Sequence, residues 1–182
     1  MARRVLMLLV LAAALAACDR SAGRARGGVA ADPYETLSLI RAKGPIPAKD
    51  FTVPALAGRP LSLGDFRQKV VLLNFWATWC PPCREEMPAM ERLYQRYKDR
   101  GLAILAISVD TNVDAVKPFV DSFRLTFPIG LDPGSAVANA YEMRALPTTF
   151  LIDRTGHIVA AAMGARDWDS DAARAVIEAL LR

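Results

Sequence analysis

The sequence contains few of the residues that build metal sites and disulfide scaffolds. Its 182 residues include three cysteines and one histidine. Three cysteines are too few for a scaffold held together by disulfides, and a structural zinc site would need a second Cys or His pair beside Cys80 and Cys83. Cys18 is distant in sequence and His157 is alone, so we predict no metal and no other cofactor. A lone histidine without a serine elbow also gives no support to serine-hydrolase chemistry.

An excess of one charge is also absent. The 23 basic and 19 acidic residues leave a net charge of +4. Arg3 and Arg4 belong to the extreme N-terminus, so the remainder of the chain is closer to neutral. Such a balance argues against nucleic acid or another polyanion as a partner. No internal repeat is apparent, and the length fits one globular domain with short extensions.

No apolar run is long enough to span a membrane. The run Val5–Ala17 has 13 residues, whereas a spanning helix needs about 20. Preceded by Arg3 and Arg4, it has the layout of a signal peptide. It ends in Leu15-Ala16-Ala17-Cys18, which resembles a bacterial lipobox, so we predict a signal peptide over residues 1–18 and lipidation of Cys18. Ordinary cleavage at Ala14-Leu15-Ala16 and a retained hydrophobic tail are the alternatives.

Such a leader predicts an exported chain in the bacterial cell envelope, on the periplasmic side of the membrane and anchored through lipid. Residues 19–44 are expected to form a flexible tether, because the stretch 19–31 is small, polar and glycine-rich and cannot bury enough apolar surface to order itself. One short helix is predicted over 34–42, which Gly44-Pro45 would end. The folded domain is therefore expected over residues 45–182.

Patterns of apolar residues in this region predict an α/β domain. Val70–Phe75 is an apolar run typical of a buried strand, and a helix with apolar residues at spacings of three and four follows to about Lys98. Pro88 should kink this helix. We expect a mixed sheet flanked by helices. Further strands are predicted over 102–109, 126–131, 148–152 and 158–163, helices over 113–123, 135–141 and 169–181, and a hairpin over 51–63.

Cys80 and Cys83 lie where the central strand gives way to the long helix. Unpaired N–H groups and a partial positive charge at a helix N-terminus favour a thiolate by roughly 0.3–1 kcal/mol, which lowers the pKa of the thiol and makes the sulfur nucleophilic. A spacing of three residues brings both sulfurs onto one face of the first turn, within reach of a disulfide. The pair is therefore predicted to perform reversible dithiol/disulfide chemistry.

The segment NFWATWCPPC, followed by REEMP, by ISVD and by LPTTFLID, resembles the TlpA/ResA class of exported thiol:disulfide oxidoreductases. The resemblance covers the chain from about residue 45 to the C-terminus. It implies a thioredoxin fold with an N-terminal β-hairpin extension and a central insertion. It also implies that Cys80 is the exposed attacking thiol and that Cys83 is the resolving thiol.

The resemblance extends to further site residues. Glu86 occupies the place of a glutamate that lies beneath the active site in ResA-like proteins, and Asn74 occupies the place of a strand aspartate of thioredoxin. Glu86 is therefore the candidate proton acceptor for Cys83, with a pKa raised by partial burial; a solvated glutamate like Glu85 is the alternative. Pro147 matches the loop proline that is cis in thioredoxin folds, where it would present the Leu146 backbone to an extended substrate; a trans proline is the alternative. The expected substrate-contacting residues are Trp79, Pro81, Pro82, Leu146, Pro147 and Thr148.

Pro81 and Pro82 indicate the direction of electron flow. Neither has an N–H to donate to the Cys80 thiolate and neither is charged, so the reduced form is stabilised less and the pair should be a reductant. We expect a membrane dithiol as electron donor and disulfide-containing client proteins; the resemblance suggests apocytochrome c or copper-site assembly proteins. The alternatives are a Cu(I) chaperone that uses the two soft thiolates and a peroxiredoxin-like peroxidase. The peroxidatic pattern has Thr or Ser three residues before its cysteine, where this chain has Ala77.

Overall fold

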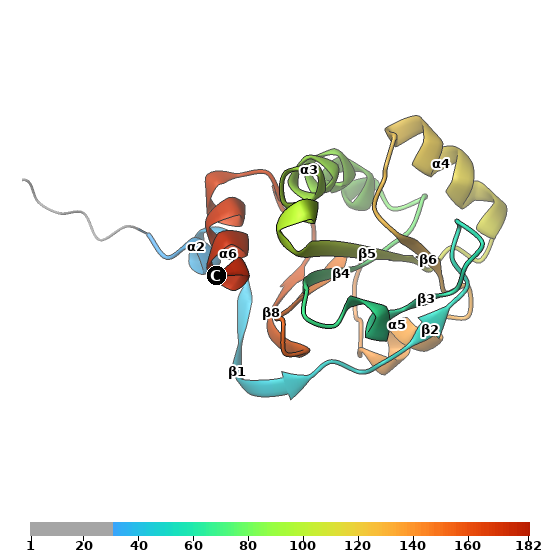
Figure 1. Cartoon of the computed structure of the whole chain (residues 1–182). Coiled ribbons are helices and arrows are strands. Elements are labelled where there is room, and N and C mark those ends of the chain that lie inside the picture. The colour runs from blue at the N-terminus through green and yellow to red at the C-terminus, as the bar shows by residue number, and fades with distance from the viewer. Residues whose placement is uncertain (1–30) are drawn as a thin grey trace, which may run out of the picture. The chain divides into compact units, whose positions relative to one another are not determined.

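The computed structural model describes residues 31–182, shown in colour in Figure 1. The predicted signal peptide, Cys18 and the first part of the predicted tether lie outside the described residues. The strands are β1 (Ile40–Pro47), β2 (Thr52–Val53), β3 (Leu61–Ser62), β4 (Val70–Trp76), β5 (Leu102–Ser108), β6 (Ile129–Leu131), β7 (Thr148–Ile152) and β8 (His157–Met163). The α-helices are α2 (Pro33–Thr36), α3 (Pro81–Tyr97), α4 (Val116–Phe123), α5 (Ala136–Ala140) and α6 (Asp171–Leu181), with short 3-10 helices at Leu63–Phe66, Lys98–Arg100 and Val113–Ala115.

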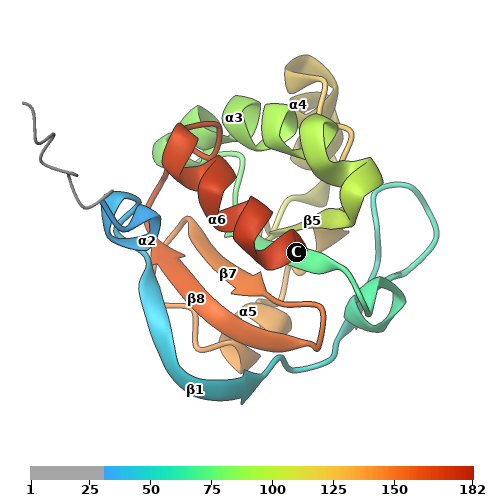
Figure 2. The same cartoon turned by 60° about the vertical axis from the view of Figure 1, so that its left-hand side comes forward.

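Six strands form one mixed sheet in the order β1-β8-β7-β4-β5-β6. The pairs β4–β5 and β5–β6 are parallel, whereas β4–β7, β7–β8 and β1–β8 are antiparallel. Helices α3 and α6 lie on one face of this sheet and α5 lies on the other (Figure 2). The strands β2 and β3 pair separately, as the predicted hairpin. The predicted α/β architecture with a mixed sheet is therefore confirmed.

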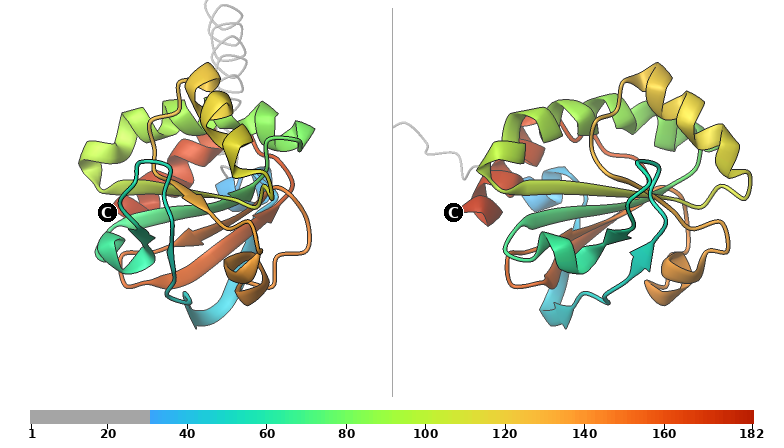
Figure 3. Two further views of the ribbon diagram at one scale, coloured as in Figure 1. Left: turned by 90° about the vertical axis from the view of Figure 1, so that its right-hand side faces the viewer. Right: turned by 45° about the vertical axis from the view of Figure 1, so that its right-hand side comes forward.

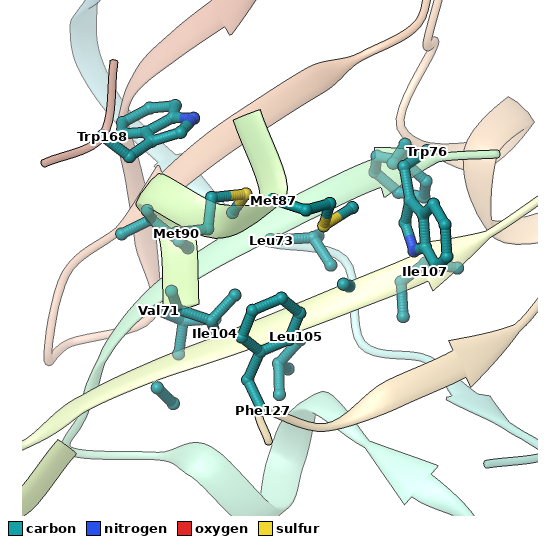
Figure 4. Packing of buried hydrophobic residues seen from close by; sticks show 14 of the residues in the cluster. Val71, Leu73, Trp76, Met87, Met90, Ile104, Leu105, Ile107, Phe127 and Trp168 are labelled. Carbon is teal, nitrogen blue, oxygen red and sulfur yellow. The ribbon is translucent and has the colours of Figure 1, made fainter. Parts of the chain in front are cut away.

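Strands β4 and β5 lie in the centre of the sheet because almost all of their residues are apolar. All seven residues of β4 and all seven of β5 are buried, as expected for strands covered on both faces. The long helix α3 presents its apolar stripe to them, and Figure 4 shows Met87 and Met90 extending from the helix toward the strands that carry Leu73 and Ile104. Pro88 lies within this continuous helix, on its exposed side. The core thus fixes the axis of α3, and with it the position of the cysteines at its first turn.

The segment between β5 and β7 forms the expected insertion, with α4, β6 and α5. Figure 3 shows α4 beside α3 on one side of the sheet and α5 on the opposite side. Phe119 of α4 packs on Trp76 at the end of β4, with ring centroids 4.9 Å apart. At Gly130 in β6, a Cβ atom would approach Ile107 Cδ1 and Val53 Cγ2 to 2.7 Å, so the hairpin and β5 can pack closely only around glycine.

The predicted boundary at residue 45 is wrong. Residues 40–47 form β1, which pairs with β8 from Ile40 opposite Ala161 to Pro47 opposite His157. Only Pro33–Thr36 is helical, and Leu37 and Leu39 are buried in the core. A glycine and two prolines suggested a break in structure, but an edge strand tolerates proline and its register shift between Arg41 and Ile46 accommodates Gly44-Pro45. Strand β1 is thus one edge of the sheet, and β6 is the other.

No helix within residues 31–182 is long and apolar enough to cross a membrane.

Candidate active site around Cys80 and Cys83

Cys80 and Cys83 form a disulfide at the junction of β4 and α3, with their Cα atoms 5.3 Å apart. Cys80 is the N-cap residue of α3, and its Sγ atom accepts a hydrogen bond from the Cys83 backbone N–H at 3.3 Å. Pro81 and Pro82 fill the first two helical positions and have no N–H. The Cys83 amide is therefore the first donor that the helix offers to the Cys80 sulfur, and the prolines add none, as expected.

The expectation that Cys80 is exposed is wrong for this disulfide form. Cys80 is 4% exposed and Cys83 is fully buried. The reason is its N-cap position, which turns Sγ back toward the helix N-terminus instead of outward. The exposed surface here belongs instead to Trp79, which is 67% exposed, and to Pro81 and Pro82. Cys80 is slightly more exposed than Cys83, and the order in which the two thiols act stays a prediction.

Asp110 holds the turn that leads into Cys80. Its carboxylate is buried and accepts hydrogen bonds from the Thr78 backbone N–H at 2.9 Å, from the Thr78 hydroxyl at 2.7 Å and from the Ser108 hydroxyl at 2.7 Å. Because Thr78 is two residues before Cys80, the buried Asp110 side chain anchors the β4–α3 connection to the end of β5. Asp110 ends the ISVD motif, so the sequence marked the residue, but no pattern in the sequence indicated its partners.

Glu86 lies one turn after Cys83 on the same buried face of α3 and is 2% exposed. Its Oε1 accepts a hydrogen bond from Asn74 Nδ2 at 2.9 Å. Its Oε2 accepts from the Trp168 indole N–H at 3.0 Å and from the Arg166 backbone N–H at 3.1 Å. The alternative of a solvated glutamate like Glu85 is therefore wrong for this residue.

Burial raises the pKa of the Glu86 carboxyl from its ordinary value of 4.5 to about 7, against the opposing effect of its three hydrogen-bond donors and of the Arg166 charge. A carboxyl with this pKa exchanges protons near neutral pH, which is the property a proton acceptor for a thiol requires. Water can reach its vicinity through a surface hollow of about 450 Å³, whose polar lining includes Glu85, Arg92, Arg166 and Asp167.

Asn74 joins Glu86 to the neighbouring strand. Its Nδ2 donates to Glu86 Oε1 and to Thr149 Oγ1, both at 2.9 Å, and Asn74 is opposite Thr149 in the β4–β7 ladder. The Oδ1 atom of Asn74 is buried and has no hydrogen-bond partner within the described part of the chain. Thr149, Arg166 and Trp168 were not found by sequence reasoning, because they contact Glu86 only through tertiary packing.

The Leu146–Pro147 peptide bond is cis. Thr148, which follows it, pairs with Phe75 of β4 and with Met163 of β8. The loop therefore lies beside the C-terminal end of β4, where the segment with the cysteines begins. Leu146 is half-buried, while Pro147 and Thr148 are buried, and the Thr148 hydroxyl donates to the Ala145 carbonyl at 2.7 Å. The expected contact of Leu146, Pro147 and Thr148 with substrate stays a prediction. The hydrogen bond of Thr148 stabilises the loop itself.

Metal ligands do not gather at this site. Within residues 31–182, no group of three or more His, Cys, Asp or Glu side chains could hold a metal ion. That the reaction uses no metal stays a prediction, and it rests on the sequence.

A cysteine pair at the start of the helix that follows a central strand, with a cis-proline loop at the same sheet edge, defines a thioredoxin-like dithiol oxidoreductase. The chain belongs to the AhpC/TSA family, whose sequence profile matches residues 46–161. The family profile therefore covers the sheet from the last two residues of β1 through most of β8, together with both cysteines.

Individual relatives of the chain are named as thiol:disulfide oxidoreductases or interchange proteins. The chain is 44% identical over 117 residues to "Thiol-disulfide oxidoreductase ResA" of Bacillus cereus, covering 64% of this chain and 68% of the relative. It is 49% identical over 111 residues to the protein of that name from Geobacillus kaustophilus, covering 61% and 64%. A solved structure from Chlorobium tepidum, assigned as thiol:disulfide interchange protein DsbE, superposes with a TM-score of 0.72 at 33% identity, covering 76% of this chain and 97% of that one.

These similarities confirm the predicted resemblance, the thioredoxin-like fold and the thiol:disulfide oxidoreductase activity. Alignments with the ResA relatives span about two thirds of those proteins' lengths. Ala77, three residues before Cys80, is fully buried and supplies no hydroxyl, and the Thr78 hydroxyl is bound to Asp110. The site therefore lacks the hydroxyl that the peroxidatic pattern places at residue 77.

Proposed function

We propose that this chain is a reductant that breaks disulfide bonds of selected proteins in the bacterial cell envelope. The observation that carries the proposal is Glu86, a buried carboxyl with a pKa near neutrality behind a helix-capping cysteine pair. Such a carboxyl can take the proton that the buried Cys83 thiol must lose before it acts as a nucleophile.

The proposed reaction starts from the dithiol form. The Cys80 thiolate attacks one sulfur of a client disulfide, forming a mixed disulfide and releasing the other client sulfur as a thiolate. Glu86 accepts the Cys83 proton, and the Cys83 thiolate attacks Cys80 Sγ. The Cys80–Cys83 disulfide forms, the second client thiolate leaves, and two electrons have passed to the client. A membrane dithiol then reduces the protein's disulfide and is itself oxidised.

The reducing direction is supported by the first turn of α3. Among its first three residues, only Cys83 supplies a backbone N–H to the Cys80 sulfur, and each donor to a thiolate favours the reduced form. With Pro81 and Pro82 in place, we expect a potential closer to about −270 mV than to about −120 mV. Equilibration with glutathione or dithiothreitol measures it; a potential above about −150 mV would contradict a reductant.

Clients are proposed to dock beside the disulfide, at the C-terminal end of β4. Trp79 and Met163 are large apolar side chains that are 67% and 51% exposed, and exposed apolar surface of this kind favours protein contact. Trp79, Pro81 and Pro82 would contact the client, and the Leu146 backbone beside the cis bond would pair with an extended client segment. Apocytochrome c haem-site cysteines and copper-site assembly proteins are the proposed client classes, by family resemblance.

The protein is further proposed to be exported and lipid-anchored at the periplasmic side through Cys18. Replacing Cys18 with Ala tests this point, because the variant should move from the membrane to the soluble fraction of the envelope. Full retention in the membrane would contradict the lipid anchor.

Cys83→Ser in the native membrane tests the reaction itself. Without the resolving thiol, the Cys80 mixed disulfide with its client should accumulate, and reduction of the trapped species should release identifiable clients. The matched control is Cys80→Ser, which removes the attacking sulfur and should trap nothing. Equal trapping by both variants would overturn the assigned order. Stoichiometric Cu(I) binding without reductase activity would favour a chaperone instead, and peroxide turnover would favour a peroxidase.

A further inference from the structure

Arg166 connects the N-terminal segment of the described chain to Glu86. It lies in the loop 164–170 between β8 and α6. Its guanidinium donates hydrogen bonds to the Leu37 carbonyl at 2.6 Å and to the Ser38 carbonyl at 3.1 Å. Its backbone N–H donates to Glu86 Oε2 at 3.1 Å. One residue thus contacts residues 37 and 38 with its side chain and the site with its backbone.

The two carbonyls are held firmly enough to serve as an anchor. Asp32 caps α2 by accepting a hydrogen bond from the Tyr34 N–H at 3.0 Å. Leu37 and Leu39, on either side of Ser38, are buried, and α2 packs against α6. The same guanidinium also donates to the Gly164 and Ala165 carbonyls at 3.1 and 2.9 Å, so the Arg166 side chain braces its own loop against the N-terminal segment.

That loop supplies two of the three hydrogen-bond donors to Glu86, the Arg166 N–H and the Trp168 indole N–H, and both donate to Oε2. We propose that Arg166 is a positioning residue: by holding the Leu37 and Ser38 carbonyls it fixes loop 164–170, and with it both donors to Glu86 Oε2. The inference deepens the proposed function, since Glu86 is the proton acceptor of that reaction.

The groups that face Glu86 determine what loosening the loop should do. Asn74 on β4 donates to the other carboxyl oxygen, Oε1, and Cys83 lies on the same buried face of α3. The Arg166 charge, its N–H and the Trp168 N–H all favour the ionised carboxylate. Glu85, Arg92 and Asp167 line the nearby hollow. Arg166→Ala removes the guanidinium charge and frees the loop, so Glu86 should hold its proton to higher pH.

The test is a ¹³C NMR titration of the Glu86 carboxyl in the oxidised full chain, with the resonance assigned by its loss in Glu86→Gln. At pH 7 about half of Glu86 should be ionised in the unmodified protein, and Arg166→Ala should reduce this fraction at least about twofold. Arg166→Lys, which keeps the charge but not the fork that spans two carbonyls, should give an intermediate fraction and covers the case in which the alanine variant does not fold.

Arg41→Ala is the matched control. Arg41 pairs with Asp32 at 2.7 Å and lies over the Tyr34 ring, so it also braces the N-terminal segment, but it makes no hydrogen bond to loop 164–170. Its titration should match that of the unmodified protein. An unchanged titration in both Arg166 variants, or an equal shift in Arg41→Ala, would overturn the proposal. A shift in the Arg166 variants without any change in the pH profile of disulfide reduction would support the positioning role and remove Glu86 from the proposed reaction.

Discussion

Glu86 should make the oxidised protein less stable as the pH rises through neutrality. Its pKa lies at about 7 in the folded chain against an ordinary value of 4.5. Between these two values the folded state binds a proton that the unfolded state has lost, so the free energy of unfolding falls with increasing pH. The stabilisation is complete below about pH 4.5 and lost above about pH 7. A difference of about 2.5 pH units corresponds to roughly 3 kcal/mol.

Glu86→Gln removes this dependence because an amide does not ionise. The variant amide can keep the Arg166 and Trp168 donors on its oxygen, and its nitrogen would face Asn74, whose unpaired Oδ1 could turn to accept it. Urea denaturation of both oxidised proteins between pH 5 and 9 measures the effect. From pH 5 to pH 9, the stability of Glu86→Gln relative to that of the unmodified protein should rise by roughly 2.5 kcal/mol.

The comparison between two proteins cancels the titration of all other groups, including Asp153 and Asp169, whose lowered pKa values act in the opposite direction. Glu85→Gln is the control, because Glu85 is the exposed neighbour on the same helix and its replacement should produce no such pH-dependent difference. A stability difference between Glu86→Gln and the unmodified protein that stays constant from pH 5 to 9 would refute the reasoning.

Three further substitutions test the packing around the site. Asp110→Asn weakens the hydrogen bonds from Thr78 and Ser108. It should lower the free energy of unfolding in urea by about 1.5–3 kcal/mol and slow disulfide reduction. Its control, Asp121→Asn, breaks an exposed ion pair with Lys117 and should lower that free energy by under about 1 kcal/mol. Gly130→Ala forces a Cβ to 2.7 Å from two side chains and should cost about 1–3 kcal/mol, unlike Gly134→Ala, whose Cβ meets nothing within 4 Å. Trp168→Phe removes one donor to Glu86 Oε2, so the carboxyl should titrate at higher pH by NMR; an unchanged midpoint would show that the indole N–H does not stabilise the carboxylate.

The N-terminal boundary shows where reading the sequence failed. Gly44-Pro45 marked the end of a tether because both residues commonly interrupt regular structure. Strand β1 nevertheless crosses them, since its partner β8 offers a free edge and a register shift absorbs the irregular residues. Whether such a segment is a linker or an edge strand depends on a partner more than 100 residues away, as in the pairing of Ile40 with Ala161.

Local chemistry was determined by the sequence alone. A buried strand that leads into a helix capped by cysteine follows from an apolar run and from the spacing of Cys80 and Cys83, because hydrophobic periodicity and capping act over a few residues. The motif also located Glu86 and Pro147. Only the tertiary structure decided that Glu86 is buried, because its donors come from β4 and from a loop about 80 residues later. The pKa of a carboxyl depends on which groups surround it in space, and that environment is assembled only when the sheet, α3 and loop 164–170 come together.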